Sequence, residues 1–194
     1  MINIVSFSGL PKAGKSESAK ILMEIDPRFR RLSFADPLKE DYCIKIGIPR
    51  KILDDVSEKE KHRKGMHQHG DNARANNPFI YADSLINRMQ DGGYYVLDDC
   101  RYLEELIRLH ELKAVLYGVH AEPHQRKSRG WVPNPINDSH PSEMELSTLS
   151  AHTWHCLGGG MIYNTKGLDY LKEQIEDLSK KYFPYTINDL ARLR

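Results

Sequence analysis

Short apolar runs alternate along this chain with longer stretches in which apolar residues recur at helical spacing. The runs at 2–7, 29–35, 94–97, 114–119 and 161–163 are short and rich in β-branched or aromatic residues, which predicts buried strands. Residues 16–26, 103–109 and 168–178 show the helical spacing. Strands that alternate with helices form crossover units in parallel sheets. The pattern therefore predicts an α/β fold, a three-layer sandwich with a mainly parallel five-stranded sheet.

Two weaker patterns fill the region between the second and third predicted strands. Pro37 fits the first turn of a helix, where its missing N–H costs nothing, and Asp36 is the candidate N-cap. Residues 54–77 are charged and rich in histidine, so we expect helices with exposed faces there.

Length and composition narrow the class of protein. The 194 residues suit one domain, 1–194, and the Pro- and Arg-rich segment at about 123–142 lies between apolar runs, which predicts an inserted lid loop. With 28 basic and 27 acidic side chains the net charge is +1, so we expect neither a nucleic-acid polymer nor a membrane as partner. Any binding of anions must therefore depend on a local group of residues and not on the net charge of the protein.

The three cysteines are widely spaced and odd in number, which argues against a disulfide framework and a zinc ribbon. No stretch approaches the roughly 18 apolar residues of a membrane span, and the chain starts without a basic leader. We therefore expect a cytoplasmic protein that is not exported, as a monomer or a homodimer.

The segment from Gly9 to Ser16 fits the pattern GxxxxGK[ST] at every fixed position and lies between a predicted strand and a predicted helix. Its glycines allow a wrapped backbone whose N–H groups hold phosphates at a helix N-terminus. Lys15 would contact the β- and γ-phosphates of ATP, and Ser16 would bind Mg²⁺. The residues expected to bind the nucleotide in this segment are Gly9, Lys12, Ala13, Gly14, Lys15 and Ser16.

A second group of polar residues follows the strand at 94–97. Open α/β sheets bind ligands beyond the carboxyl ends of their strands, so Asp99 is a candidate for the magnesium shell, with Asp98 as its rival. Arg101 has a planar guanidinium that suits a phosphate, although it could instead be a surface arginine paired with Glu104 or Glu105.

The lid segment carries Arg126 and Arg129. Arginines on a closing lid can stabilise the charge of a transferring phosphoryl group, although a solvated basic loop is an equal alternative. The histidine pairs at 67–69 and 152–155 lack a complete, well-spaced ligand set for a transition metal. Residues 164–166, Asn-Thr-Lys, lack the final Asp of the base-reading tetrapeptide of G proteins, because Gly167 follows, and this disfavours a GTP switch.

Six segments together resemble the P-loop family of bacteriophage deoxynucleoside monophosphate kinases and animal-type phosphomevalonate kinases. They are FSGLPKAGKSESA, FADPLKEDY, GDNARANNP, YYVLDDCRYLEEL, RGWVPNPINDSHPSE and MIYNTKGLDYLKEQI, and they span nearly the whole chain. The phosphate loop is common to many NTPases, whereas Ala-Asp-Pro-Leu-Lys followed by Asp-x-Arg and then His-x-Ser-Glu is more selective. The resemblance implies a P-loop NTPase-type fold.

The resemblance also implies roles for individual residues. Lys15 and Ser16 would handle ATP and Mg²⁺, and Asp99 and Arg101 occupy the family's Asp-x-Arg positions. Arg126 and Arg129 become lid residues. The remaining assignments, by resemblance alone, are Lys39 and Arg74 facing the phosphorylated acceptor, Glu143 near the acceptor, and Asn164 beside the adenine of ATP.

These residues predict an ATP-dependent phosphotransferase whose acceptor is itself a phosphate. Such an acceptor is already ionised at pH 7 and needs no strong general base, which fits the absence of a Ser/His or Cys/His constellation. Our first interpretation is a (deoxy)nucleoside monophosphate kinase of nucleotide metabolism. Phosphomevalonate kinase is the alternative, and a non-catalytic ATP-binding sensor or adaptor is an alternative from another class.

Overall fold

The computed structural model describes residues 2–184, except for the side chains of residues 136 and 137. One sheet has five strands, all parallel, in the order β2-β3-β1-β4-β5. The strands are β1 (Asn3–Ser8), β2 (Phe29–Leu32), β3 (Tyr94–Leu97), β4 (Val115–His120) and β5 (Gly160–Tyr163). The predicted mainly parallel five-stranded sheet is confirmed.

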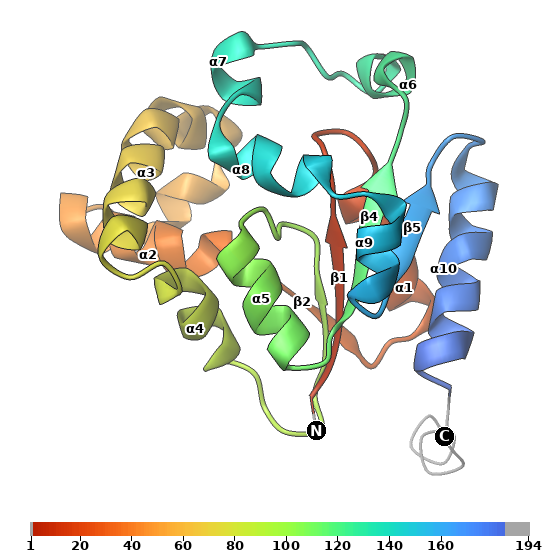
Figure 1. Ribbon diagram of the computed structural model, residues 1–194. Helices are drawn as coiled ribbons and strands as arrows, with labels where there is room; N and C mark the ends of the chain where they lie inside the picture. Colours follow the sequence, from red (N-terminus) through yellow and green to blue (C-terminus); the bar gives the residue numbers. More distant parts are fainter. Residues whose placement is uncertain (1, 185–194) are drawn as a thin grey trace.

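Helices connect the strands as crossovers (Figure 1). The helices are α1 (Lys15–Ile25), α2 (Ala35–Ile46), α3 (Val56–Asn76), α4 (Ile80–Ile86), α5 (Leu103–Glu111), α6 (Pro123–Ser128), α7 (Pro135–Asp138), α8 (Pro141–Met144), α9 (Ala151–Cys156) and α10 (Leu168–Tyr182), with the 3₁₀ turns η1 (Arg50–Asp54) and η2 (Glu145–Thr148). The charged, histidine-rich stretch predicted to be helical is the long helix α3, as expected.

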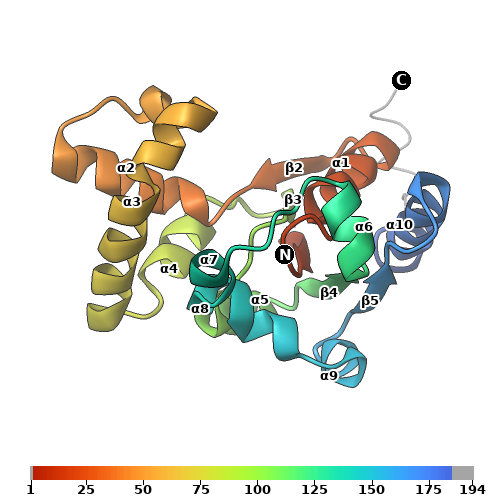
Figure 2. The same ribbon diagram turned by 90° about the horizontal axis from the view of Figure 1, so that it is seen from above.

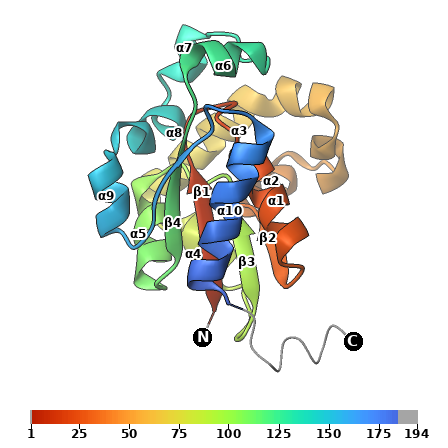
Figure 3. The same cartoon turned by 90° about the vertical axis from the view of Figure 1, so that its right-hand side faces the viewer.

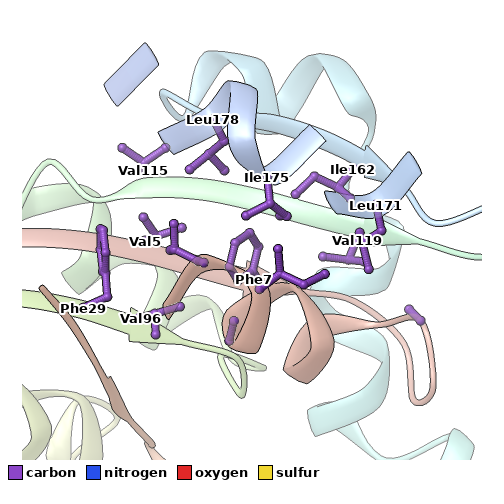
Figure 4. Close-up of a cluster of buried hydrophobic side chains, with 14 of the residues drawn as sticks. Val5, Phe7, Phe29, Val96, Val115, Val119, Ile162, Leu171, Ile175 and Leu178 are labelled. Carbon is purple, nitrogen blue, oxygen red and sulfur yellow. The ribbon is translucent and has the colours of Figure 1, made fainter. Parts of the chain in front are cut away.

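The sheet is covered on both faces because alternate residues of its strands point in opposite directions. Val5 and Phe7 of β1 pack with α1 and α10, whereas Ile4 packs on the other side with α4, α5 and α9. Figure 3 shows the two layers of helices on either side of the sheet. Figure 4 shows Phe7, Val119 and Ile175 converging in the first of these cores. The predicted three-layer arrangement is therefore confirmed.

Helices α2 and α3 project beyond the sheet from the side of the edge strand β2 (Figure 2). They share a small core with η1, built from Tyr42, Leu53 and Met66 with Cys43 and Ile48. Because α2 and α3 have a core of their own, they can form one wall of a site instead of packing as another layer over the sheet. None of the helices among residues 2–184 is long and apolar enough to cross a membrane.

Two local predictions are wrong in detail. Strand β2 ends at Leu32 rather than residue 35, and α2 begins at Ala35, so Asp36 lies in the first turn of the helix and is not its N-cap. The carboxylate of Asp99 takes the capping role instead, because it accepts hydrogen bonds from the backbone N–H groups of Phe34 (3.1 Å) and Ala35 (3.0 Å). Pro37 does lie in the first turn, as predicted.

The lid segment also differs from the loop that its composition predicted. It forms the short helices α6, α7 and α8, and Pro123, Pro135 and Pro141 each stand at the start of one of them. Proline is compatible with that position because a first-turn N–H has no partner within the helix. Figure 1 shows these helices crossing above the carboxyl ends of β1 and β4.

Candidate functional site

The phosphate loop, residues 9–16, joins the carboxyl end of β1 to α1. Gly9, Lys12 and Gly14 have positive φ angles of 148°, 61° and 118°, which gives the loop its wrapped path. A Cβ at Gly9 would collide with the carbonyl oxygen of Val119, and one at Gly14 would collide with the side chain of Asn164. The two fixed glycines of the motif are therefore required by close packing as well as by conformation.

Lys15 is the buried cation of this loop. Its ammonium group donates hydrogen bonds to the carbonyl oxygens of Gly9 (2.6 Å) and Leu10 (3.0 Å), and the residue is 9% exposed. Burial, followed by repulsion from Arg101, lowers the pKa of Lys15 to about 7. An anion in the loop would relieve both effects, so the site favours a bound phosphate.

A cleft of about 430 Å³ opens beside the phosphate loop, between the loop and helices α2 and α3. Basic residues exceed acidic ones by eight to four among the described residues that line it. The basic residues are Lys12, Lys15, Arg31, Lys39, Lys59, Arg63, Arg74 and Arg101, and the acidic ones are Asp36, Asp98, Asp99 and Glu105. The cleft is a local site for anions in a protein whose net charge is only +1.

Helix α3 supplies one wall of the cleft with a single cationic face. Lys59, Arg63, His67 and Arg74 all line it, at intervals of four, four and seven residues, which bring side chains to one side of a helix. The side chain of Lys59 has no ion pair or hydrogen bond among the described residues, and its backbone N–H donates to the carbonyl of Asp55. Burial, followed by repulsion from Lys39 and Arg63, lowers the pKa of Lys59. The crowded cations would be stabilised by an acceptor that carries negative charge.

Two adjacent carboxylates after β3 have different surroundings. Asp99 accepts hydrogen bonds from the hydroxyl of Ser33 (2.5 Å) and from the N–H groups at the start of α2. Asp98 is 3% exposed, and its Oδ1 accepts from Nε of Arg31 at 2.8 Å. Oδ2 of Asp98 is buried and has no hydrogen-bond partner among the described residues.

That unpartnered oxygen provides a test of whether the site fits Mg²⁺. A buried carboxylate oxygen without a donor suits a hard cation, and Ser16 presents an exposed hydroxyl in the same cleft. Asp98 and Ser16 therefore fit the ion, whereas the oxygens of Asp99 are already occupied by three donors.

Arg101 lines the cleft, and both its backbone N–H and its guanidinium are hydrogen-bonded. Its backbone N–H donates to Oε2 of Glu105 at 2.8 Å, and its guanidinium pairs with the carboxylate of Glu143 in the lid. Glu105 also accepts from the N–H of Tyr102 at 3.2 Å, and burial raises the pKa of Glu105 to about 8. The predicted alternative of a surface pair with Glu104 or Glu105 is not what forms, since Glu105 bonds the backbone of Arg101 and not its guanidinium.

Arg74 is positioned by aromatic rings. Its guanidinium lies 3.9 Å from the ring centroid of Tyr102 and 5.1 Å from that of Tyr81. Lys39 lies on α2 at 3.7 Å from Asp36. Both residues expected from the resemblance to face the acceptor therefore line the cleft, on two different helices.

Arg126 and Arg129 contact the backbone of the phosphate loop and are not among the residues that line the cleft. Nε of Arg126 donates to the carbonyl of Pro11 at 2.8 Å, and Arg129 donates to the carbonyl of Asn164 at 3.0 Å and lies 3.4 Å from those of Lys12 and Ala13. Asn164 is 6% exposed and donates to the carbonyl of Ala13 at 2.9 Å. These three residues thus contact the outward carbonyls of the loop, and Asn164 buttresses it.

The structure brings most of the predicted site residues to one place. Seven of them line the cleft, namely Lys12, Lys15, Ser16, Lys39, Arg74, Asp99 and Arg101. Glu143 reaches it through its pair with Arg101. Sequence reasoning missed Arg31, Lys59, Arg63 and Glu105 as cleft residues. The four-residue interval between Lys59 and Arg63 was a usable signal, whereas nothing local marks Arg31, which meets Asp98 from a distant strand.

Comparison with known proteins gives two findings. The family model described as phosphomevalonate kinase matches residues 7–114, which is more than half of the chain. Among solved structures, the shikimate kinase from Acinetobacter baumannii in complex with shikimate has a similar fold, with a TM-score of 0.50 and 13% sequence identity. The match covers 92% of this chain and 91% of that one. It supports the predicted P-loop NTPase fold.

Proposed function

The chain belongs to the phosphomevalonate kinase family, and we propose that it transfers the γ-phosphoryl group of ATP to the phosphate of phosphomevalonate. The observation that carries the proposal is the cleft beside Lys15, whose far walls on α2 and α3 are lined by cations. Phosphomevalonate has a phosphate at one end and a carboxylate at the other. An acceptor with two anionic ends matches basic residues distributed over two helices.

The residues of the site have distinct roles under this proposal. The N–H groups of the phosphate loop and Lys15 bind the phosphates of ATP, and Arg74 and Arg101 bind and orient the acceptor. Alignment of the two substrates and stabilisation of charge provide most of the catalysis in phosphoryl transfer. Bound Mg²⁺, for which Asp98 and Ser16 are the proposed ligands, would neutralise charge between the phosphates of ATP.

The guanidinium of Arg101 is paired with Glu143 of the lid. An acceptor phosphate would compete with Glu143 for the same guanidinium, because both offer oxygens to its donors. Glu143 is thus proposed to keep Arg101 oriented until the acceptor binds.

The second candidate for the acceptor is a (deoxy)nucleoside monophosphate, which was the first interpretation from the sequence. The observation that favours it is the presence of hydrogen-bonding groups on the cleft wall, including Asp36, His67 and Ser142, which could bind a base. Against it, Phe34 and Tyr102, which are the Phe, Tyr or Trp residues among the described residues that line the cleft, are 3% and 8% exposed and offer little ring surface for stacking.

A coupled assay tests the proposal. The protein is incubated with ATP and Mg²⁺ and, separately, with phosphomevalonate and each nucleoside monophosphate, and ADP is measured. We expect ADP only with phosphomevalonate, and a loss of at least about 100-fold in Lys15→Ala, because this lysine supports charge that grows in the transition state. ADP formed only with a nucleotide would establish the second candidate, and ATP binding without turnover would establish the sensor.

A matched pair of lysine variants tests the cleft itself. Lys59→Ala removes an unpaired cation from the cleft, whereas Lys64→Ala removes an exposed lysine of the same helix that does not line it. We expect Lys59→Ala to raise the KM for the acceptor by about tenfold, as expected for the loss of a binding charge, and Lys64→Ala to leave it unchanged. Equal effects of the two variants would contradict binding of the acceptor in this cleft.

A further inference from the structure

Trp131 covers one face of Arg126 in the lid. The centre of the guanidinium lies 3.9 Å from the centroid of the indole ring. The backbone N–H of Trp131 donates to the carbonyl of Arg126 at 2.9 Å, and Nε of Arg126 donates to the carbonyl of Pro11 at 2.8 Å. The arginine is therefore held between a ring of the lid and the backbone of the phosphate loop.

The surroundings of this arginine are unusual for a buried cation. Arg126 is 6% exposed, yet no carboxylate forms an ion pair with it among the described residues. A buried guanidinium is normally paired, since desolvation of an unpaired charge is unfavourable. Only its Nε is engaged; the two Nη groups have no hydrogen bond within the part of the chain that is described. Burial lowers the pKa of Arg126, and Asp138 opposes that effect at a distance.

The indole N–H of Trp131 is buried as well and also lacks a partner among the described residues. The position of the ring therefore does not give its own N–H group a hydrogen bond. Its contribution in this structure is the flat surface that it offers to the guanidinium. Cation–π contact of this kind strengthens as water is excluded from the pair.

We propose that Trp131 is a positioning residue for ATP, acting by holding Arg126 so that its two Nη groups are available to the phosphates of the nucleotide. This inference rests on the proposed nucleotide site at the phosphate loop. The ring and the Pro11 carbonyl fix the orientation of the guanidinium before the nucleotide arrives. Less side-chain freedom is then lost on binding, and a planar fork can take two phosphate oxygens at once.

The role of the ring is tested by substitutions that separate its aromatic face from its bulk. Trp131→Phe keeps a face for the cation, and Trp131→Leu fills space without one. We expect Trp131→Leu to raise the Kd for a non-hydrolysable ATP analogue, measured by calorimetry, by about fivefold to tenfold, and Trp131→Phe to raise it less than about twofold. Val132→Ala, at an adjacent side chain that is 78% exposed, is the control and should bind as the wild type does.

A double-mutant cycle shows whether Trp131 acts through Arg126. Each Trp131 substitution is repeated in an Arg126→Ala background, and folding is checked by circular dichroism. If the inference holds, Trp131→Leu has no further effect on Kd once Arg126 is absent. The same loss in both backgrounds would mean that the ring contacts the nucleotide directly or acts on the lid in general, and it would overturn the inference. So would a Trp131→Leu variant that binds as tightly as Val132→Ala.

Steady-state kinetics give a second measurement. A purely structural role of Trp131 would not change the KM for ATP selectively over the KM for the acceptor. We expect Trp131→Leu to raise the KM for ATP and to leave the KM for the acceptor within about twofold, since neither Trp131 nor Arg126 is among the residues that line the cleft. Parallel increases of both KM values would contradict the inference. Binding of the ATP analogue is independent of the acceptor. A protein that shows the predicted binding cycle but phosphorylates no acceptor would therefore refute the proposed function alone.

Discussion

Replacement of Glu105 by Gln should change how the stability of the protein depends on pH. Glu105 is 5% exposed and bonds the backbone N–H groups of Arg101 and Tyr102. Burial raises the pKa of its carboxyl from 4.5 to about 8. A carboxyl with a raised pKa binds more protons in the folded chain than in the unfolded one between these two values. Stability from this group is therefore fully present below pH 4.5 and is lost as the pH rises to about 8.

The magnitude follows from the same two pKa values. Each pKa unit corresponds to about 1.4 kcal/mol, so the interval sets an upper limit of about 5 kcal/mol on the loss of stability between pH 4.5 and pH 8. We expect a smaller measured value, because a buried site relaxes and admits water when it ionises. Glutamine keeps an oxygen that can accept from Arg101 and cannot ionise. The Glu105→Gln variant should therefore lose less stability than the wild type as the pH rises.

Urea unfolding at pH 5 and pH 9, followed by circular dichroism, measures this difference. We expect the change in the free energy of unfolding between the two pH values to be smaller in Glu105→Gln than in the wild type by at least about 1 kcal/mol. Glu104→Gln, at a partly exposed neighbour in the same helix, is the control for the loss of one charge. An identical pH dependence in Glu105→Gln and the wild type would refute the reasoning.

Two further predictions concern the strand end and the acceptor. Asp98→Asn should raise the Mg²⁺ concentration needed for half-maximal activity more than Asp99→Asn does, while Asp99→Asn should lower the melting temperature more, because Asp99 holds the start of α2. A stronger effect of Asp99→Asn on the Mg²⁺ requirement would reverse the assignment. Arg101→Lys keeps the charge but loses the planar fork, so kcat/KM for the acceptor should fall by about tenfold with ATP binding little changed. Kinetics with each substrate varied separately check this, and an unchanged KM and kcat for the acceptor would show that Arg101 does not bind its phosphate.

The strands and the phosphate loop could be predicted because their signals are local. Residues 94–97 were predicted as a strand with the bounds that the structure has, since β-branched and aromatic residues in a short run fit a buried parallel strand. The glycines of the phosphate loop are required by backbone conformation, which a sequence motif records directly. Patterns of this kind depend on neighbours in the chain and need no knowledge of the rest of the fold.

The start of α2 could not be predicted in the same way. The local sequence favours Asp36 as its N-cap, because an aspartate before a proline is a good local signal. The donors at the helix start are instead bonded by Asp99, which is 64 residues from Ala35 in the chain. A non-local carboxylate can replace a local cap wherever the sheet brings it close, and no local pattern reports that replacement. The same limit applies to Arg31, whose partner Asp98 is 67 residues away.

The choice between Asp98 and Asp99 shows where sequence reasoning reaches its limit at the site. Consecutive residues of a strand point to opposite faces, and Val96 and Leu97 indeed belong to different cores. Asp98 and Asp99 follow the end of that strand and both line the cleft, so alternation along the strand does not choose between them. Which of them remains free depends on where α2 begins, because its N–H groups occupy Asp99. The oxygen left without a donor is on Asp98, so the position of a helix start more than 60 residues earlier decides which carboxylate is available to bind the ion.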